Sequence, residues 1–298
     1  MPYLAIIPVI VSGRAISFDS EIDYADGNNT LEKLLINHIF AAFNTYTSAL
    51  RFMRKFFGYL LSPVFYLLFG IIITLFHPIQ WLCLKLGGYR GHKTCVDMLN
   101  LGLLATYYVL GNTIKFVNRQ NLPMERPILF VANHQSMYDI PPLIFFLRRH
   151  HGKFISKIEL TKGIPSISFN LRHGGAANID RKDPKQSIAE ILKLANNMKG
   201  KNWSAFIFPE GTRAKTGKIK PFNIGGIATI LKKVPNVLVV PIAIRNSWQM
   251  VRYGFFPLNT FTRMSWEVLD PIEPQGLHAE EVVALVEARI KEKVEINA

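Results

Sequence analysis

The sequence predicts an α/β fold: a mixed, largely parallel sheet flanked by helices and preceded by an N-terminal apolar helical hairpin. Two observations carry this prediction. After Arg119, short apolar segments alternate with longer helical patterns, an order typical of domains built around a parallel or mixed sheet. Before Arg119, two long runs lack every Asp, Glu, Lys and Arg, which is typical of helices in an apolar environment.

The amino-acid composition excludes several kinds of protein and favours others. The chain has 298 residues, 49% of them hydrophobic and 19% charged, with a formal net charge of +14, which excludes a disordered, collagen-like or purely coiled-coil protein. The surplus of cations favours binding of nucleic acid, of an anionic membrane or of an anionic substrate. Cys83 and Cys95 lie in apolar surroundings, so we interpret them as reduced packing residues.

The chain divides into three regions by composition. Residues 1–30 form an extension to which we assign no role, residues 31–118 a helical membrane-anchoring region, and residues 119–298 the α/β domain. The anchoring region holds the two charge-free runs, at residues 56–84 and 98–114. Because a membrane helix needs about 20 apolar residues, the first run is long enough to cross and the second is marginal.

Basic residues flank both charge-free runs. They are Arg51, Arg54 and Lys55 before the first run, Lys85, Arg90 and Lys93 after it, and Lys115 and Arg119 after the second. Cations at every boundary favour a hairpin that enters one leaflet and returns, because each flank then stays near anionic headgroups. Two full crossings, or a buried hairpin of a soluble protein, are the alternatives.

The α/β region contains four predicted strands and four predicted helices. Apolar runs predict the strands at residues 128–131, 154–156, 205–208 and 237–244. Helical patterns occupy residues 141–149, 184–198, 225–233 and 278–294. In such folds ligands bind outside the carboxyl ends of the strands, so the residues that follow each strand are the candidates for a site.

The first candidate motif is Asn133-His134-Gln135-Ser136-Met137-Tyr138-Asp139, directly after a strand. If a tight turn brings His134 and Asp139 together, the carboxylate can bind one ring nitrogen of the histidine, which leaves the other nitrogen to take a proton. This pattern predicts a catalytic His134 oriented by Asp139. The alternative is structural, because Ser136-x-x-Asp139 is also a capping box that would start the next helix.

The second candidate motif is Phe208-Pro209-Glu210-Gly211-Thr212-Arg213, again after an apolar strand. Gly211 lets the backbone approach a ligand closely, and the guanidinium of Arg213 can hold a carboxylate or phosphate. An ordinary strand-end turn is the alternative. A nucleotide-binding loop is excluded, because the spacing from Gly211 to Gly217 is one residue too long and Ile219 replaces the required Ser or Thr.

Other chemistries find no support in the sequence. No Gly-x-Ser-x-Gly elbow is present, so Ser136 is a poor candidate for a hydrolase nucleophile. No cluster of Cys, His or acidic residues has metal-ligand spacing. We therefore expect neither a metal ion nor a cofactor.

Taken together and in order, the motifs resemble those of the glycerolipid acyltransferases, and within them most closely the lysophosphatidic acid acyltransferases (1-acyl-sn-glycerol-3-phosphate acyltransferases). Besides the two motifs above, Lys157-Ile158-Glu159-Leu160, Pro165 and Ile179-Asp180-Arg181 resemble the second motif of the family, and Val240-Pro241-Ile242-Ala243-Ile244 resembles the fourth. One departure is Asn223 after Phe222, where many members have Lys.

The resemblance implies an enzyme of phospholipid synthesis that moves a fatty acyl group from acyl-CoA or acyl carrier protein to the free hydroxyl of lysophosphatidic acid, making phosphatidic acid. It implies that Glu210 and Gly211, with Thr212 beside them, help to hold the glycerol portion. Lys157 and Arg213 would clamp the phosphate, with Arg181 in support.

The expected partners are membrane lipids, the thioester donor and lysophosphatidic acid, with no nucleic acid. We expect the protein to be membrane-associated, with its α/β acyltransferase domain on the cytoplasmic side. One alternative is an acyltransferase of the same fold that uses another lysophospholipid or glycerol 3-phosphate. An alternative from a different class is a non-catalytic membrane protein that binds lipid.

Overall fold

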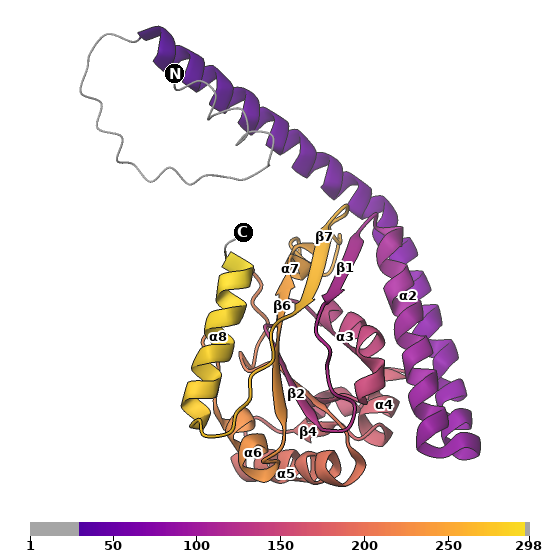
Figure 1. Ribbon diagram of the computed structural model, residues 1–298. Helices are drawn as coiled ribbons and strands as arrows, with labels where there is room; N and C mark the ends of the chain where they lie inside the picture. The colour runs from indigo at the N-terminus through magenta and orange to yellow at the C-terminus, as the bar shows by residue number, and fades with distance from the viewer. Residues whose placement is uncertain (1–29, 296–298) are drawn as a thin grey trace. The chain divides into compact units, whose positions relative to one another are not determined.

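The computed structural model in Figure 1 describes residues 30–295, with side chains from residue 37 onward. The predicted extension at residues 1–30 therefore lies outside the described residues, apart from its last position. Residues 54–296 form one compact unit, and the part of the first helix before Arg54 belongs to a separate unit. The fold described below is that of the unit that begins at Arg54.

Helix α2 (Thr30–Val109) contains the predicted apolar hairpin. Its dihedral angles leave the helical region at Gly88, with φ 55° and ψ −146°, and the chain reverses there into two arms, residues 54–87 and 89–109 (Figure 1). A Cβ atom added to Gly102 would lie 3.4 Å from Cγ2 of Ile72, so the arms touch. The break falls where the positive φ suits glycine, whereas Pro63 and Pro78 of the first apolar run lie inside the helix.

The hairpin has two different sides. On the side facing the sheet, Phe65 and Tyr107 are fully buried and share a hydrophobic core with Leu258, and the hydroxyl of Ser62 accepts a hydrogen bond from the Leu258 N–H at 2.8 Å. The other side exposes large apolar side chains, among them Phe56, Leu60, Leu67, Leu75, Leu82 and Leu86. Part of the described chain, Asn37–Val109, is long and apolar enough to cross a membrane by length and composition.

Within residues 30–295 the strands form one seven-stranded sheet in the order β1-β7-β6-β2-β5-β3-β4. Their bounds are β1 Thr113–Asn118, β2 Ile128–Ala132, β3 Lys153–Lys157, β4 Ala177–Ile179, β5 Ala205–Ile207, β6 Leu238–Arg245 and β7 Arg263–Val268. Every neighbouring pair is parallel except β6 with β7, which is antiparallel. This arrangement confirms the predicted mixed, largely parallel sheet.

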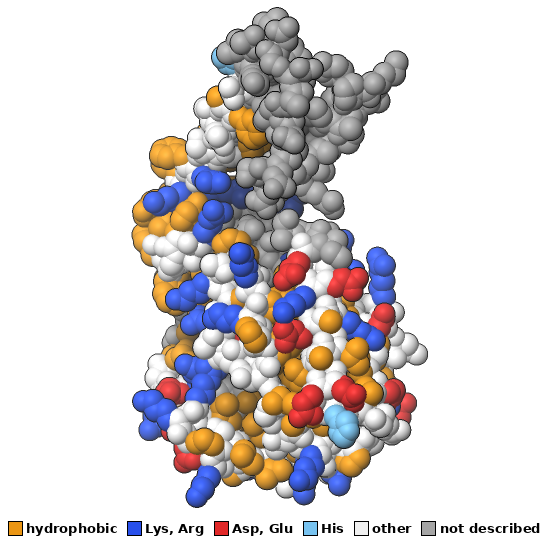
Figure 2. Space-filling model, turned by 90° about the vertical axis from the view of Figure 1, so that its left-hand side faces the viewer, with side chains coloured by type: hydrophobic (Ala, Val, Ile, Leu, Met, Phe, Trp, Pro, Cys, Tyr) orange, Lys and Arg blue, Asp and Glu red, His pale blue; other side chains and the backbone are white. Residues whose placement is uncertain are grey.

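Helices and the hairpin cover both faces of the sheet (Figure 1). The side of the molecule that lies on the left in Figure 1 carries side chains of both charges among hydrophobic ones (Figure 2). The helices after α2 are α3 (Ile140–Phe146), α4 (Ile167–His173), α5 (Pro184–Lys201), α6 (Gly225–Lys233), α7 (Ser247–Met250) and α8 (Ala279–Glu295). Strand β2 contributes to both cores, because side chains of a strand alternate between its faces. Ile128 and Phe130 pack in the core that contains the hairpin, and Leu129 and Val131 pack in the core with α5, α6 and α8.

The predicted strands correspond to β2, β3, β5 and β6, and the predicted helices to α3, α5, α6 and α8. Three strands were not predicted. Strand β4 has only three residues, and β1 lies at the edge of the sheet with mostly exposed or half-buried side chains. The residues of β1 were assigned to the end of the second apolar run and the segment after it, so this part of the prediction was wrong. Whether residues 31–118 act as a separate anchoring region stays a prediction.

Candidate active site

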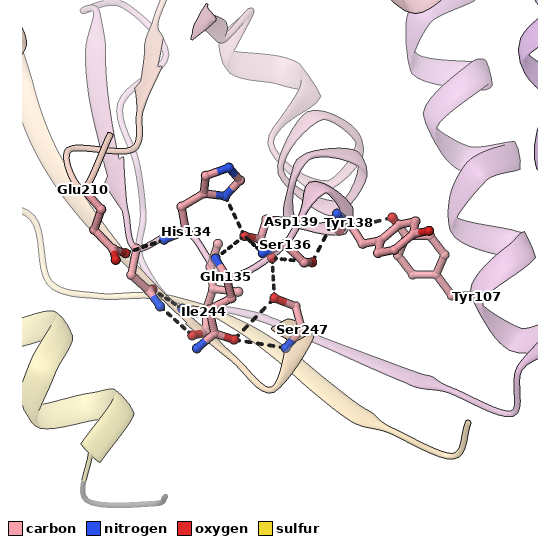
Figure 3. A network of polar contacts seen from close by, with 10 residues as sticks. Tyr107, His134, Gln135, Ser136, Tyr138, Asp139, Glu210, Ile244 and Ser247 are labelled. Carbon is pink, nitrogen blue, oxygen red and sulfur yellow. Dashed lines mark hydrogen bonds and ion pairs between the residues drawn. The ribbon is translucent and has the colours of Figure 1, made fainter. Parts of the chain in front are cut away.

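The loop after β2 places His134 beside Asp139 (Figure 3). Nδ1 of His134 lies 2.8 Å from Oδ2 of Asp139, and the exposed fraction is 16% for the imidazole and 0% for the carboxylate. A carboxylate beside Nδ1 keeps the proton on that nitrogen, so Nε2 presents its lone pair. Among the residues that the structure describes, Nε2 has no hydrogen-bond partner. The arrangement can therefore take a proton from a hydroxyl that reaches Nε2.

The same carboxylate closes the turn that follows His134. Oδ2 of Asp139 accepts the backbone N–H groups of Gln135 at 2.7 Å and of Ser136 at 2.9 Å, while the hydroxyl of Ser136 accepts from the N–H of Tyr138 at 3.2 Å. This is the capping box of the short helix Met137–Asp139. One carboxylate thus makes both the contact with His134 and the capping box, and the catalytic role of the pair stays a prediction.

The loop after β5 holds His134 from the other side. The ring of Phe208 stacks on the imidazole, with a centroid distance of 4.1 Å and an interplanar angle of 13°. The N–H of His134 donates to Oε1 of Glu210 at 2.7 Å, and the carbonyl of His134 accepts from the N–H of Ala214 at 2.7 Å. These contacts fix both the plane of the ring and the backbone that carries it.

Glu210 joins two loops through its carboxylate. Its second oxygen, Oε2, accepts from the N–H of Lys220 at 3.1 Å, and only 5% of the residue is exposed. Burial raises the pKa of Glu210, and the two backbone hydrogen bonds oppose that rise. Gly211 follows with φ 67°, a conformation that favours glycine, and the hydroxyl of Thr212 accepts from Nζ of Lys220 at 2.9 Å. The glycerol-binding role of this loop stays a prediction.

The predicted phosphate-binding cations lie at one edge of the sheet. Strands β2, β5, β3 and β4 are successive neighbours and run parallel, so their carboxyl ends meet at the same edge. Lys157 ends β3, Arg181 follows β4 and Arg213 follows β5, and all three are exposed. Nζ of Lys220 donates to the carbonyl of Arg213 at 3.1 Å, which adds a further cation beside the loop. That these side chains bind one phosphate stays a prediction.

Three buried polar residues of the site have roles that the sequence did not indicate. The side chain of Asn133 pairs with the backbone of Ile244 in both directions, at 2.8 and 2.7 Å. Oε1 of Gln135 accepts from the N–H of Ser247 at 3.0 Å. These contacts tie the loop of His134 to the end of β6 and the start of α7. A single sequence gives no signal for them, because a polar residue in a loop is usually solvated.

Within residues 30–295, no three His, Cys, Asp or Glu side chains lie together as ligands for a metal ion. The site consists instead of a His–Asp pair, a glycine-containing loop and a row of cations at the carboxyl edge of the sheet. Such a set can move a proton and hold an anion.

Comparison with known proteins shows which proteins this domain resembles. Residues 113–245 match the family model described as Acyltransferase, so this part of the α/β domain is similar to the acyltransferases. The matched range contains His134, Asp139 and the loop of Glu210. The resemblance found in the motifs is thereby confirmed.

The chain is similar to enzymes that act on lysophosphatidic acid. It is 36% identical to the chloroplastic 1-acyl-sn-glycerol-3-phosphate acyltransferase BAT2 of Brassica napus, over 45% of this chain and 38% of the relative. It is 27% identical to 1-acyl-sn-glycerol-3-phosphate acyltransferase alpha of Ovis aries, over 64% and 65% of the two chains. The chain thus spans less than two thirds of the length of these curated relatives.

A solved structure has the same fold. The crystal structure of PlsC, the 1-acyl-sn-glycerophosphate (LPA) acyltransferase from Thermotoga maritima, superposes with a TM-score of 0.67 at 25% sequence identity. The match covers 82% of this chain and 96% of that one. Because the match extends well beyond the 113–245 range, it confirms the predicted fold class for most of the chain.

The contacts of Glu210 lead to a prediction that separates positioning from substrate binding. In Glu210→Gln the amide can accept only one of the two backbone N–H groups, and a buried unsatisfied donor costs about 1–3 kcal/mol. Because one of these groups belongs to His134, we expect kcat to fall about tenfold while KM for the acceptor substrate stays within about twofold. Steady-state kinetics with the acceptor varied measures both. Glu280→Gln, an exposed carboxylate at the start of α8, is the control. A raised KM at unchanged kcat would instead support contact with the glycerol portion.

Proposed function

We propose that this protein transfers a fatty acyl group from a thioester donor to the free hydroxyl of 1-acyl-sn-glycerol 3-phosphate, giving phosphatidic acid. The observation that carries the proposal is the pair of His134 and buried Asp139, 2.8 Å apart, at the sheet edge where Lys157, Arg181 and Arg213 also lie. The names of the similar proteins support the same substrate.

In the proposed reaction His134 acts as a general base. The acceptor hydroxyl gives its proton to Nε2 as its oxygen attacks the carbonyl carbon of the thioester, and Asp139 stabilises the imidazolium that forms. The tetrahedral intermediate then collapses, the carbon–sulfur bond breaks, and the proton on Nε2 passes to the leaving thiolate. No covalent acyl-enzyme is required, because the acceptor attacks the donor directly.

The phosphate of the acceptor supplies the binding energy for recognition. It carries between one and two negative charges near neutral pH and calls for several charge-assisted donors. We propose that Arg213 and Lys157 provide the main contacts and Arg181 a supporting one. Many members of the family have Lys at the position of Asn223. In this chain Lys220, whose Nζ lies within hydrogen-bond distance of Thr212, supplies that positive charge instead.

One assay tests the function and its alternatives. Purified protein is given acyl-CoA or acyl carrier protein as donor, and lysophosphatidic acid, glycerol 3-phosphate or lysophosphatidylcholine as acceptor, with the product identified by mass. We expect phosphatidic acid as the main product. Transfer to another acceptor would identify an acyltransferase of the same fold with a different substrate. Lipid binding without transfer would identify the non-catalytic alternative.

We propose that the exposed side of the hairpin attaches the protein to a membrane, with the α/β domain on the cytoplasmic side. The exposed leucines support this, because transfer of apolar surface from water is favourable by about 25 cal/mol per Å². Flanking cations such as Arg54, Lys55 and Lys115 suit anionic headgroups.

A charge on the exposed side of the hairpin tests the attachment. Leu67 is 63% exposed, so Leu67→Asp leaves the core intact, and we expect it to lower partition into anionic vesicles about tenfold, since a buried carboxylate is costly in lipid. Ile188→Asp, the same kind of change at a 49% exposed position of α5, is the matched control. Sedimentation with vesicles measures both. Equal partition of the two variants would contradict attachment through this side.

A further inference from the structure

The carboxylate of Asp139 has a hydrogen-bond donor that lies far from it in the sequence. Its other donors come from the turn itself: Nδ1 of His134, the N–H groups of Gln135 and Ser136, and the hydroxyl of Ser136 at 3.3 Å. Among the described residues, the one donor from outside the turn is the hydroxyl of Ser247, which binds Oδ1 (Figure 3).

The hydroxyl of Ser247 has one proton and two acceptors near it. Oε1 of Gln135 lies 3.3 Å away, farther than Oδ1 of Asp139. The proton goes to the carboxylate, because a hydrogen bond to an ionised acceptor is shorter and stronger than one to an amide. Ser247 is fully buried, so water does not compete for this bond.

Contacts other than the one with Asp139 also fix the backbone around Ser247. Its N–H donates to Gln135 at 3.0 Å, and Ile244, at the end of β6, is paired with the side chain of Asn133. The hydroxyl is therefore presented to Oδ1 from a rigid position. The match to the acyltransferase family model ends at residue 245, so Ser247 lies outside it.

We infer that Ser247 is a positioning residue: its hydroxyl holds Asp139 in the rotamer in which Oδ2 faces Nδ1 of His134. The inference rests on the proposed function for its kinetic consequence, although the orientation of the dyad exists without substrate. Asp139 binds His134 through Oδ2 alone, so a donor on Oδ1 keeps the carboxylate from turning away. In this way a residue at the start of α7 sets the tautomer of a histidine that follows β2.

The kinetic test removes the hydroxyl alone. We expect Ser247→Ala to lower kcat about tenfold, the scale of one hydrogen bond to a charged group, with KM for donor and acceptor within about twofold. Ser204→Ala is the matched control. Ser204 is likewise a buried serine, and its hydroxyl makes a hydrogen bond with the N–H of Ile128 at 3.2 Å but does not contact His134 or Asp139. If Ser247→Ala does not fold, Ser247→Cys keeps the volume and weakens the donor.

Two further measurements separate positioning from general support of the site. In a His134→Ala background, Ser247→Ala should cause no further loss of the residual rate, because its effect passes through the imidazole; losses that multiply would overturn the inference. Nitrogen-15 shifts of labelled histidine rings should report Nδ1–H for His134 in the wild type and a mixture of tautomers in Ser247→Ala. An unchanged tautomer would also overturn it. If the wild type transfers no acyl group, the proposed function fails and the tautomer measurement still decides on Ser247.

Discussion

His134→Ala should abolish acyl transfer while leaving fold and membrane binding intact. Removal of a general base costs roughly 10²–10⁴-fold in rate, and the loss should appear in kcat because Nε2 acts on the reacting proton. The fold should survive, since the imidazole is partly exposed and the contacts of its backbone with Glu210 and Ala214 do not involve the ring. Single-turnover rates and a thermal melt of the same preparation measure the two effects.

Asp139→Asn is the control for the role of the charge. An amide oxygen at this position can still accept the N–H groups that close the turn, and its NH₂ group can donate to the hydroxyls that now donate to Oδ1. The variant should therefore fold and lose less activity than His134→Ala, because the base survives without the charge that stabilises its imidazolium. Activity lost only in proportion to unfolded protein would mean that the motif serves the capping box alone.

Arg213→Ala should raise KM for lysophosphatidic acid by about one to two orders of magnitude, the equivalent of roughly 1.5–3 kcal/mol for a charged hydrogen bond. The guanidinium is exposed just past β5, where it can bind two phosphate oxygens at once. KM for the thioester donor should change little. Steady-state kinetics with each substrate varied in turn gives both values.

Two comparisons sharpen this test. Lys215→Ala removes an exposed cation from the same loop and should leave KM for the acceptor nearly unchanged. An acceptor without the phosphate, used poorly by the wild type, should lose little further in Arg213→Ala. If both acceptors lost activity equally, Arg213 would support the loop and would not bind the phosphate.

Much of the fold could be predicted because its buried strands leave a strong signal. Ile128–Ala132 is buried at every position and reads as an uninterrupted apolar run, and α6 was predicted with its observed bounds of Gly225–Lys233. Strand β1 left a weaker signal, because its apolar residues continue directly from a helix. Its pairing with β7, parallel and far away in sequence, depends on tertiary structure that no local pattern contains.

The candidate site likewise has some features that local sequence patterns predict and others that depend on tertiary structure. The contact of His134 with Asp139 could be predicted, because both follow a buried strand at a spacing that has a chemical meaning, whereas the roles of these residues and of Glu210 stay predictions. What could not be predicted is how they are held. Both oxygens of Glu210 bind backbone N–H groups from two loops, and the hydroxyl of Ser247 reaches Asp139 across 108 positions of sequence. Contacts of this kind depend on where distant segments meet in space.

If the exposed side of the hairpin binds a bilayer as proposed, lipid is a ligand of the folded state. Phe65 and Tyr107 in the arms of the hairpin fill the same core as Phe130 of the central strand β2, so the arms cannot detach without exposing that core to water. A bilayer that binds their outer side more tightly than it binds the unfolded chain acts as a ligand of the native state, and by mass action such a ligand raises the free energy of unfolding. The temperature at which the α/β domain melts is then a property of protein and membrane together.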